Sequence, residues 1–593
     1  MTTPTPPTDT RPQVDVSDEL SARRALRRWL ALQPDVYDQR GTLVRWDAAA
    51  DGGRGALVVL DADRLADYCA DRIETVKVSR SGDARSVLLP RRMAQALART
   101  EGAGLRPLQG VSRWPLVRPD GTVTRGAGYD PDTRFIIAAD DVKPVPNRPT
   151  SADVDTARAT LRRLFGGFPY ASRDRDGGDL GADYAHTIGL YLSPLLRTFL
   201  PTEARSPLHV VTATGPGSGK SYISTEGIEA VFSTRRMAAE QSDRELQKTL
   251  VAALESQADA AVIAFDNFPT GGQVTGAAFA RWVTEPKISG RVIGTGRTPT
   301  FTNTYTWVVN GNRIRLGGDM ARRTVVISLE SDADDPSAVE HPFDFLEEIS
   351  ARRGDVLWAL LTLVRNWTAL PAEARPVRAV QLGQFSQWMT TVASILDHAG
   401  IVDFNANRSA VMTEADEMSA DYGRFYGAVL DLLGGGWLRA MQICGRAELQ
   451  DLIPRTEGQE DRTVGHRALG RRVLRPQTGR VFLGPDGRKL TVRERWDAHA
   501  KRWLYQVVDV AADRIARAAE AAQQRARAFV DRMRRRAELR RVRSHVEATR
   551  RRVVTSPAPP PRPDDDRPRG VRVESDLLRR AAAALDGMRP STT

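Results

Sequence analysis

The sequence predicts an α/β protein whose central domain contains a parallel sheet, with smaller domains before and after it. Strand-like and helix-like runs alternate between residues 201 and 335, which is the pattern of a parallel sheet with crossover helices. The first strand-like run, LHVVTAT, leads into a glycine-rich loop and a helix, and a later run, AVIAFD, ends in an aspartate. At 593 residues the chain is roughly four times as long as a common domain, so several domains are expected.

Shifts in composition mark the domain boundaries. Residues 1–17 lack apolar periodicity and are expected to be disordered, whereas 18–141 alternate short strand-like pieces such as 42–46 and 56–60 with helical ones such as 90–99. The proline-rich VKPVPNRPTS is a linker, and a GGG triplet marks a later boundary. The predicted domains are a small α+β N-terminal domain (18–141), a helical collar (152–200), the parallel-sheet core (201–335), a helical subdomain (336–433), a winged-helix-like domain (437–510), an Arg-rich helix (511–552) and a mostly disordered tail (553–593).

The charge balance indicates a polyanionic partner. The chain carries 86 Lys and Arg against 74 Asp and Glu, a net charge of +12, and its isoelectric point is near 10.0. Between residues 511 and 552, 14 arginines face five acids, so most of the net charge lies in one short segment. Because so few acids balance this helix, contact with DNA or RNA phosphates is favoured over a helix that only faces solvent. A coiled-coil role in assembly is the alternative.

Other features of the composition exclude several classes of protein. The longest apolar run, 356–364, is far shorter than the ~20 residues of a membrane span, and the polar N-terminus has no apolar signal core. The two cysteines, Cys69 and Cys444, lie far apart with no Cys/His spacing around them, which excludes a disulfide framework and an ordinary zinc site. We therefore expect no membrane partner and a cytoplasmic location.

The segment VVTATGPGSGKSYIS has the pattern of a phosphate-binding loop between a strand and a helix. Glycines let successive backbone N–H groups surround a phosphate, a lysine reaches the β- and γ-phosphate oxygens, and a serine hydroxyl holds Mg²⁺. The first glycine of the usual GxxxxGK[ST] pattern is replaced by Thr214. The order of strand, loop, Lys-Ser and helix favours ATP and Mg²⁺ binding over a chance glycine turn. The predicted binding residues are Gly215, Gly217, Ser218, Gly219, Lys220 and Ser221.

The run AVIAFDNF supplies the carboxylate that such a loop needs. Asp266 follows small and apolar residues, so it is expected at a strand end, where it would hold Mg²⁺ through water with Ser221. Asn267 stands where many such ATPases carry a glutamate that orients the attacking water. The catalytic base is therefore open. Glu245 is the nearest helical candidate, and a solvated acid paired with Lys248 is the simpler interpretation of it.

The segment TYTWVVNGNRIRLGGDMARRTVVISLE indicates strand, polar turn, basic turn and strand. Asn312, or Asn310, is expected at a strand end, where an amide can sense the γ-phosphate. Arg322 and Arg323 at the tip of a turn could reach the nucleotide of a neighbouring subunit as arginine fingers. Adjacent arginines on a turn are otherwise an ordinary solvated feature, but their place after the phosphate loop and Asp266 favours a catalytic role.

Two further patterns lie outside this core. RTVGHRALGRRVLR and the hairpin-like TGRVFLGPDGRKLTV suit a winged helix. Its basic helix could enter a DNA groove, unless the domain only packs against its neighbours; the candidate DNA contacts are Arg467, Arg471 and Arg472. Near the N-terminus, Asp61 and Asp63 resemble the paired acids of a primase, but no histidine precedes His186, so we interpret them as a turn and a helix cap and predict no primase.

Taken together, these motifs resemble the phage and plasmid primase-helicase ATPases, relatives of superfamily 3 helicases within the AAA+ class. The segments that carry the resemblance are TGPGSGKS, DRELQK, VIAFDNF, FARWVTEPKISGRVIGTGR, VVNGNRIRLGGDMARR, SQWMTTVASILDHAGIVDF and, upstream, GLRPLQGV, LVRPDGTV and GYDPDTRF. By resemblance, Lys220 and Ser221 bind ATP–Mg²⁺, and Asp266 is the Walker B acid. Asn312 matches the sensor asparagine, and Arg322 with Arg323 match the finger pair.

The resemblance implies an AAA+ core that assembles into a homo-oligomeric ring, commonly a hexamer, translocates on DNA and separates its strands. Such a protein would act in the replication of a phage, satellite or plasmid, with host replication proteins as further partners. The alternative is a DNA-bound ATPase switch that loads or recruits replication proteins, or an element-encoded defence ATPase, without unwinding. A packaging or transposition motor is a third hypothesis, which the same motifs favour less than the other two.

Overall fold

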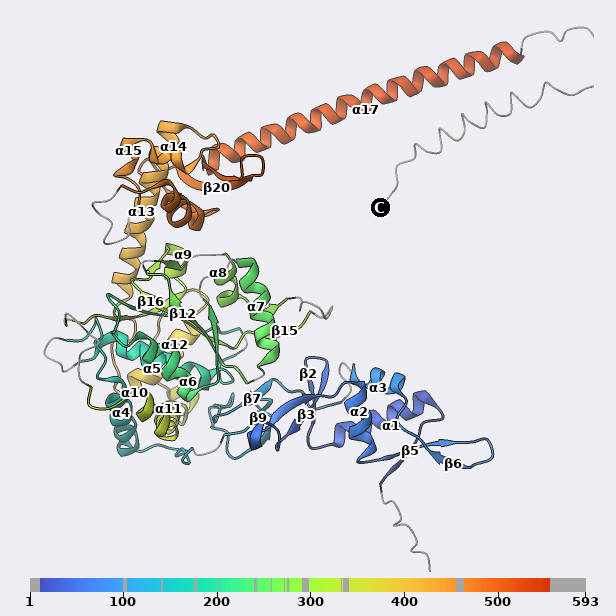
Figure 1. Ribbon diagram of the computed structural model, residues 1–593, viewed down its shortest axis with the longest axis vertical. Coiled ribbons are helices and arrows are strands. Elements are labelled where there is room, and N and C mark those ends of the chain that lie inside the picture. Colours follow the sequence, from blue (N-terminus) through green and yellow to red (C-terminus); the bar gives the residue numbers. More distant parts are fainter. Residues whose placement is uncertain are drawn as a thin grey trace, which may run out of the picture. The chain divides into compact units, whose positions relative to one another are not determined.

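A computed structural model of the chain places two compact units, Met1–Ala511 and Ala512–Thr593, which are described separately (Figure 1). Among the described residues every helix is too short or too polar to span a bilayer. The described residues are 11–99, 104–139, 142–174, 179–201, 203–238, 243–257, 259–270, 272–274, 277–290, 298–331, 333, 341–454 and 463–554.

The first unit is organised around a five-stranded sheet in which every pairing is parallel. The strand order is β11 (Thr234–Ala238), β12 (Val262–Phe268), β16 (Thr306–Asn312), β10 (Leu208–Ala213) and β18 (Thr324–Leu329). The strands β16, β10 and β18 are rich in Val, Ile and other apolar residues and almost wholly buried, as expected for the interior of a parallel sheet covered on both faces. The predicted α/β class with a parallel sheet is confirmed.

Helices that precede, separate and follow these strands in the chain contribute side chains to the same hydrophobic core. They are α4 (Ser151–Phe165), α5 (Gly181–Leu196), α6 (Gly227–Val231), α7 (Asp243–Ser256), α8 (Ala277–Thr284), α9 (Gly318–Ala321), α10 (Phe345–Ala351), α11 (Arg353–Thr368) and α12 (Ser386–His398). Every residue from Ala182 to Leu196 in α5 is buried. The buried Asp183 carboxylate accepts the backbone N–H groups of Ser172 and Ser328, which ties α5 to the end of β18. Two short pairs, β13 (Gln273–Val274) with β17 (Arg315–Leu316) and β14 (Lys287–Ser289) with β15 (Thr300–Thr302), complete this part.

The N-terminal part of the chain contains three helices and three small sheets among its described residues. Its helices are α1 (Glu19–Leu32), α2 (Ala62–Ala70) and α3 (Arg91–Ala98). Its sheets are β1 (Gln13–Asp15), β5 (Glu74–Val78) and β6 (Ala84–Ser86); β2 (Val36–Gln39), β3 (Thr42–Asp47) and β4 (Ala56–Val59); and β7 (Gly110–Ser112), β9 (Phe135–Ile137) and β8 (Gly128–Asp130). The predicted elements at 42–46, 56–60 and 90–99 are confirmed as β3, β4 and α3.

One expectation for the N-terminal segment is wrong. Residues 13–15, expected to be disordered with the rest of 1–17, form β1, which pairs in parallel with β5. The backbone ladder, together with the burial of Val16 at 4% exposure, orders a stretch too short to show periodicity. Residues 1–10 lie outside the described part. Asp61 caps α2 by accepting the N–H of Arg64 at 2.9 Å, so its interpretation as a helix cap is confirmed.

A second core lies toward the end of the first unit. The helix α13 (Arg408–Leu433) ends before the GGG triplet, yet its Phe425, Tyr426 and Val429 pack with the following segment. The GGG triplet therefore marks the end of a helix, whereas the second hydrophobic core already begins within α13. The elements after the triplet are α14 (Ala440–Cys444), α15 (Ala447–Gln450), α16 (His466–Ala468), a π-helical turn (Leu469–Leu474) and the antiparallel strands β19 (Val481–Leu483), β20 (Lys489–Asp497) and β21 (Arg502–Asp509).

The last described element is α17 (Val510–Val554), which confirms a helix over the Arg-rich segment. Beyond its first residues, its side chains up to residue 548 are almost all exposed, including the apolar ones of Phe529 and Met533. The predicted tail lies outside the described residues from 555 onward.

Candidate functional site

Three neighbouring strands of the central sheet bring the predicted site residues to one edge. The strand β16 lies between β12, which carries Asp266, and β10, which leads into the glycine-rich loop. In the parallel register Ala213, the last residue of β10, is opposite Asn312, the last residue of β16. Ligands of parallel sheets bind outside the carboxyl ends of the strands. The loop, Asp266 and Asn312 therefore share the edge at which a ligand is expected.

The loop after β10 is shaped by glycines. Gly217 and Gly219 have φ angles of +79° and +84°, which side chains disfavour, and a Cβ on Gly219 would lie 2.7 Å from the Phe168 ring. The Ser218 hydroxyl donates to the Gly215 carbonyl at 3.0 Å, which closes the turn. A helix begins directly after the loop, so its free N–H groups are presented at this edge, as in an anion site.

The ammonium group of Lys220 has no ion-pair partner among the described residues. Its Nζ lies over its own loop, 3.2 Å from the Gly215 carbonyl and 3.4 Å from the Ser218 hydroxyl. Burial lowers the pKa of Lys220 below its ordinary value, and no carboxylate among the described residues forms an ion pair with it. Since a desolvated ammonium is costly without a counter-charge, this position favours binding of an anion such as phosphate.

Asp266 projects from a bulge at the end of β12. The register between β12 and β16 shifts between Phe265 and Phe268, and Asp266 accepts the N–H of Asn267 at 3.0 Å. Arg236 lies 3.9 Å from the Asp266 carboxylate and 2.5 Å from that of Glu229. Sequence reasoning missed Arg236, because its neighbours on β11 follow no motif. No group of three or more metal-ligating acids, histidines or cysteines occurs within the described residues.

The structure separates the two asparagines that the sequence left as alternatives. Both lie on the same face of β16 because strand side chains alternate. Asn310 is 1% exposed, and its amide is hydrogen-bonded to Ser224, Thr225 and the backbone of Asn267. Asn312 lies at the edge, and its Oδ1 has no hydrogen-bond partner in the described part of the chain. Asn312 is therefore the amide whose oxygen is unpaired and buried at the end of the strand, whereas that of Asn310 is already paired.

The two predicted finger arginines lie at the other edge of the sheet. Arg322 is exposed after α9, and the guanidinium of Arg323 donates to Asp319 at 3.0 Å. The next residue, Thr324, is opposite Leu208, the first residue of β10, whereas the glycine-rich loop follows the last. A six-residue strand spans about 20 Å, so in one chain these arginines and the loop are at opposite ends of β10.

The remaining predicted residues are placed as follows. The helix α7 contains Glu245, but its side chain lies outside the described residues, and so does that of Arg472. Arg467 in α16 and Arg471 in the π-helical turn are both exposed, and neither is brought near the glycine-rich loop by any recorded contact.

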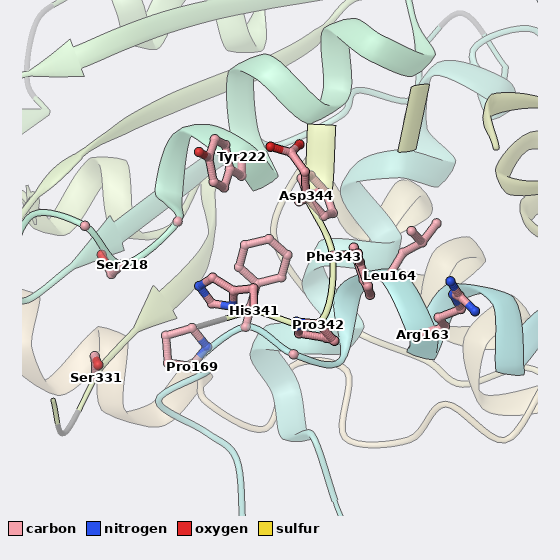
Figure 2. Close-up of a pocket in the computed structure, with 15 residues that line it drawn as sticks. Arg163, Leu164, Pro169, Ser218, Tyr222, Ser331, His341, Pro342, Phe343 and Asp344 are labelled. Atoms are coloured by element: carbon pink, nitrogen blue, oxygen red, sulfur yellow. The ribbon is translucent and has the colours of Figure 1, made fainter. Parts of the chain in front are cut away.

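An aromatic cavity that the sequence did not reveal adjoins the glycine-rich loop. It encloses about 420 Å³ and is lined by Gly217–Gly219, by Tyr222 just after the loop, and by rings from two other segments, 163–169 and 341–345. Tyr222 and Phe345 stack at 6.0 Å between ring centroids, with Phe168 edge-on to Phe345 at 5.1 Å. Figure 2 shows Ser218 at one end of the group and Arg163 at the other, with His341 between them. The shape suits a planar ring next to a phosphate group.

No family model matches the chain, and no curated protein matches it in sequence. Among solved structures, an A-form apo structure of the NrS-1 C-terminal region is 12% identical over 72% of this chain and 92% of that chain, with a TM-score of 0.27. Another apo structure of the NrS-1 C-terminal region is 11% identical over 76% and 99%, with a TM-score of 0.28. A JCV helicase is 13% identical over 45% and 66%, with a TM-score of 0.21. At these TM-scores the likenesses assign neither fold nor function.

Proposed function

We propose that the chain is a Mg²⁺-dependent ATP hydrolase that acts on DNA as a helicase or translocase. The observation that carries this proposal is the meeting of the Lys220 loop, Asp266 and Asn312 at one carboxyl edge of the sheet. A desolvated lysine, a helix start and an aromatic cavity adjoin there, and together they fit the phosphates and the base of a nucleotide.

Each side chain has a role that its position supports. The backbone N–H groups of the loop and Lys220 bind the phosphates, while the hydroxyl of Ser221 and, through water, the carboxylate of Asp266 hold Mg²⁺. The ion neutralises charge on the phosphate oxygens. Two protein ligands are enough for Mg²⁺, because this ion keeps several bound waters and also binds substrate phosphates. Asn312 orients the γ-phosphate.

The attacking water lacks an obvious base beside Asp266. Asn267 carries an amide, which does not accept a proton as a carboxylate does, so hydrolysis would depend on orienting the water and stabilising charge. Glu245 stays the candidate base, and its substitution by Gln is the direct test.

The aromatic cavity is proposed to hold the base of the nucleotide. The stacked Tyr222 and Phe345 rings offer apolar faces to a purine, and the cavity begins where the loop ends. A Tyr222→Ala variant is expected to raise KM for ATP more than it lowers kcat, because the base lies away from the reacting phosphate.

Assembly into a ring is supported by the position of Arg322 and Arg323. Since they lie at the opposite edge from the loop of their own chain, they would complete the site of a neighbouring copy, as arginine fingers do. A hexamer is the ring that the family resemblance implies. Exposed arginines in α17, and Arg467, Arg471 and Arg472, are the proposed DNA contacts, and replication of a phage, satellite or plasmid with host replication proteins is the proposed setting.

The test measures ATP hydrolysis and strand displacement with the purified full chain. We expect DNA to stimulate hydrolysis and a forked duplex to be separated only with ATP and Mg²⁺. The Lys220→Ala chain, which lacks the phosphate cation, should do neither, whereas Lys77→Ala on the exposed face of β5 should behave as wild type. Stimulated hydrolysis without displacement would favour a DNA-bound switch that loads replication proteins. No hydrolysis under any condition would contradict the proposal.

A further inference from the structure

Asn310 lies at the centre of the site without facing its open edge. Its side chain is 1% exposed and projects from β16. The Nδ2 amide donates to the Ser224 hydroxyl at 2.7 Å, and Oδ1 accepts the backbone N–H of Asn267 at 2.9 Å. A longer contact joins Nδ2 to the Thr225 hydroxyl at 3.4 Å. One buried amide thus bridges the helix that follows the phosphate loop and the turn that ends β12.

The direction of these hydrogen bonds is set by their chemistry. The Ser224 hydroxyl donates to the carbonyl of Lys220 at 2.7 Å, and the Thr225 hydroxyl to that of Ser221 at 3.3 Å. Because a carbonyl only accepts, both hydroxyl protons are used there, and the hydroxyl oxygens accept from Asn310. The backbone N–H of Asn267, at the bulge in β12, donates to the oxygen of the same side chain. An amide supplies donor and acceptor together, whereas a carboxylate supplies no donor.

The helical segment that meets Asn310 is a π-turn at Tyr222–Glu226. It is closed by the N–H of Gly227, which donates to the carbonyl of Tyr222, and a Cβ on Gly227 would lie 2.0 Å from that oxygen. The Tyr191 hydroxyl donates to a carbonyl within the turn at 3.1 Å. Single π-turns within helices often occur at functional sites. This wide turn is held by glycine and tyrosine, and it carries the two hydroxyls that meet Asn310.

The other end of the bridge is a strained turn beside the metal-binding acid. Asn267 has a φ of +54°, a conformation that non-glycine residues disfavour. Its N–H is shared between Oδ1 of Asn310 at 2.9 Å and Oδ1 of Asp266 at 3.0 Å. A strand bulge redirects the side chains that leave it. The hydrogen bond from Asn267 to Asn310 therefore ties the backbone next to Asp266 to the amide.

We propose that Asn310 is a positioning residue that holds the start of the phosphate-loop helix and the Asp266 turn at a set separation. The hydroxyl of Ser221 and the carboxylate of Asp266 can then act on one Mg²⁺ together. This role rests on the proposed ATPase function. Asn310 does not touch the nucleotide, which is the role of Asn312 two residues later. Loss of the Asn310 amide leaves both proposed Mg²⁺ ligands in place but removes the hydrogen bonds that link the segments carrying them.

The test measures ATP turnover and, separately, equilibrium ATP binding by the full chain, each as a function of Mg²⁺ concentration. Groups that orient metal ligands typically contribute 10–100-fold to metal affinity or activity. For Asn310→Ala we expect the Mg²⁺ midpoint to rise about 10-fold and kcat to fall about 10-fold, while KM for ATP at saturating Mg²⁺ stays within about 2-fold of wild type. Asn312→Ala is the matched control, because it removes the same amide from the same strand face. It should lower kcat without moving the Mg²⁺ midpoint.

A second variant keeps the test decisive if Asn310→Ala does not fold. Ser224→Ala removes the hydroxyl that links Asn310 to the Lys220 carbonyl and changes little volume, so it should raise the Mg²⁺ midpoint in the same direction. Thermal unfolding of each variant reports whether it is folded. An unchanged midpoint in the folded variants, or in Ser224→Ala alone if Asn310→Ala is unfolded, overturns the positioning role. Absence of turnover in the wild-type chain would instead overturn the proposed ATPase, so the two failures are distinguishable.

Discussion

The carboxyl ends and the amino ends of the strands in the central sheet form two edges that differ in the contacts made within a single chain. At the carboxyl edge, the phosphate loop, Asp266 and Asn312 meet, and the buried amide of Asn310 joins their supporting turns. At the amino edge, Arg322 is exposed, and Arg323 contacts Asp319 and a backbone carbonyl of its own chain.

Under the proposed function, this difference implies a site divided between copies. An ATP site with arginine fingers needs groups from both edges, and one sheet presents them at opposite ends of its strands. Substitutions at the carboxyl edge should therefore act on the nucleotide of the same chain. Substitutions at the amino edge should act on the nucleotide of a neighbour.

The largest effect is expected at the carboxyl edge, for Lys220→Ala. No other ammonium is recorded at the phosphate loop within the described residues, so ATP hydrolysis should be abolished. Steady-state turnover with saturating Mg²⁺ measures this, with Lys77→Ala as the control for loss of a lysine. Residual turnover above about a tenth of wild type would contradict the assignment of the loop.

The amino edge should give a different kind of defect. Arg323→Ala is expected to bind ATP as wild type does, because its own loop is intact, yet to lose about a thousandfold in turnover if the finger acts on a neighbour. Equilibrium nucleotide binding and turnover, measured on the same preparation, check both halves. Arg322→Ala is the matched comparison, since the adjacent side chain is exposed and has the same charge. Weakened binding in Arg323→Ala would place the arginine in the site of its own chain.

The Arg-rich helix α17 should affect DNA binding and leave both edges intact. Each phosphate contact contributes about −0.7 to −0.9 to the slope of log K against log salt. If four of the 14 arginines between residues 511 and 552 contact phosphate, deletion of residues 511–593 should make the slope shallower by roughly 3 and weaken binding at moderate salt. Hydrolysis without DNA should survive, because every proposed nucleotide residue precedes the deletion. An unchanged slope would move the DNA contacts to Arg467, Arg471 and Arg472.

The smallest effect on ATP turnover is expected at His209 in β10, whose substitution should change the stability of the fold instead. Burial lowers the pKa of His209 from an ordinary value of 6.5 to about 3, with its ring against Trp388 and His186 adding a smaller effect in the same direction. The unfolded chain then binds this proton between pH 6.5 and 3 and the folded chain does not, so stability falls as pH falls through that range. One unit of pKa difference is worth about 1.4 kcal/mol.

Replacing that imidazole should make the fold less sensitive to acid. In His209→Leu the Nε2 atom that lacks a hydrogen-bond partner among the described residues is also removed. Acid unfolding followed by circular dichroism should have its midpoint at lower pH than wild type, whereas the exposed His499→Leu should leave it unchanged. A midpoint at higher pH in His209→Leu would contradict the buried neutral histidine.

The sequence predicted those parts of the site whose signals are local. The β-branched run before the loop became β10 at Leu208–Ala213, one residue shorter than expected, and the apolar run before Asp266 became β12. The Arg-rich helix also follows from composition. These elements depend on neighbours in the chain.

Other parts depend on neighbours in space. Asn310 and Asn312 share a strand face, and only the approach of the π-turn to Asn310 distinguishes them. The aromatic cavity takes Phe168, Tyr222 and Phe345 from separate segments with no common spacing. The short strand β1 is ordered by pairing with β5, which is distant from it in the sequence.

Mixing two inactive chains tests the divided site most directly. Lys220→Ala keeps its amino-edge arginines, and Arg323→Ala keeps its phosphate loop, so a mixed assembly contains some interfaces with every group intact. Chains produced together, to ensure mixed assemblies, should hydrolyse ATP faster than either variant alone. As a control, Lys220→Ala mixed with the Lys220→Ala, Arg323→Ala double variant should stay inactive. Turnover in the first mixture that never exceeds that of its parents, in assemblies shown to contain both chains, would contradict a site shared between copies.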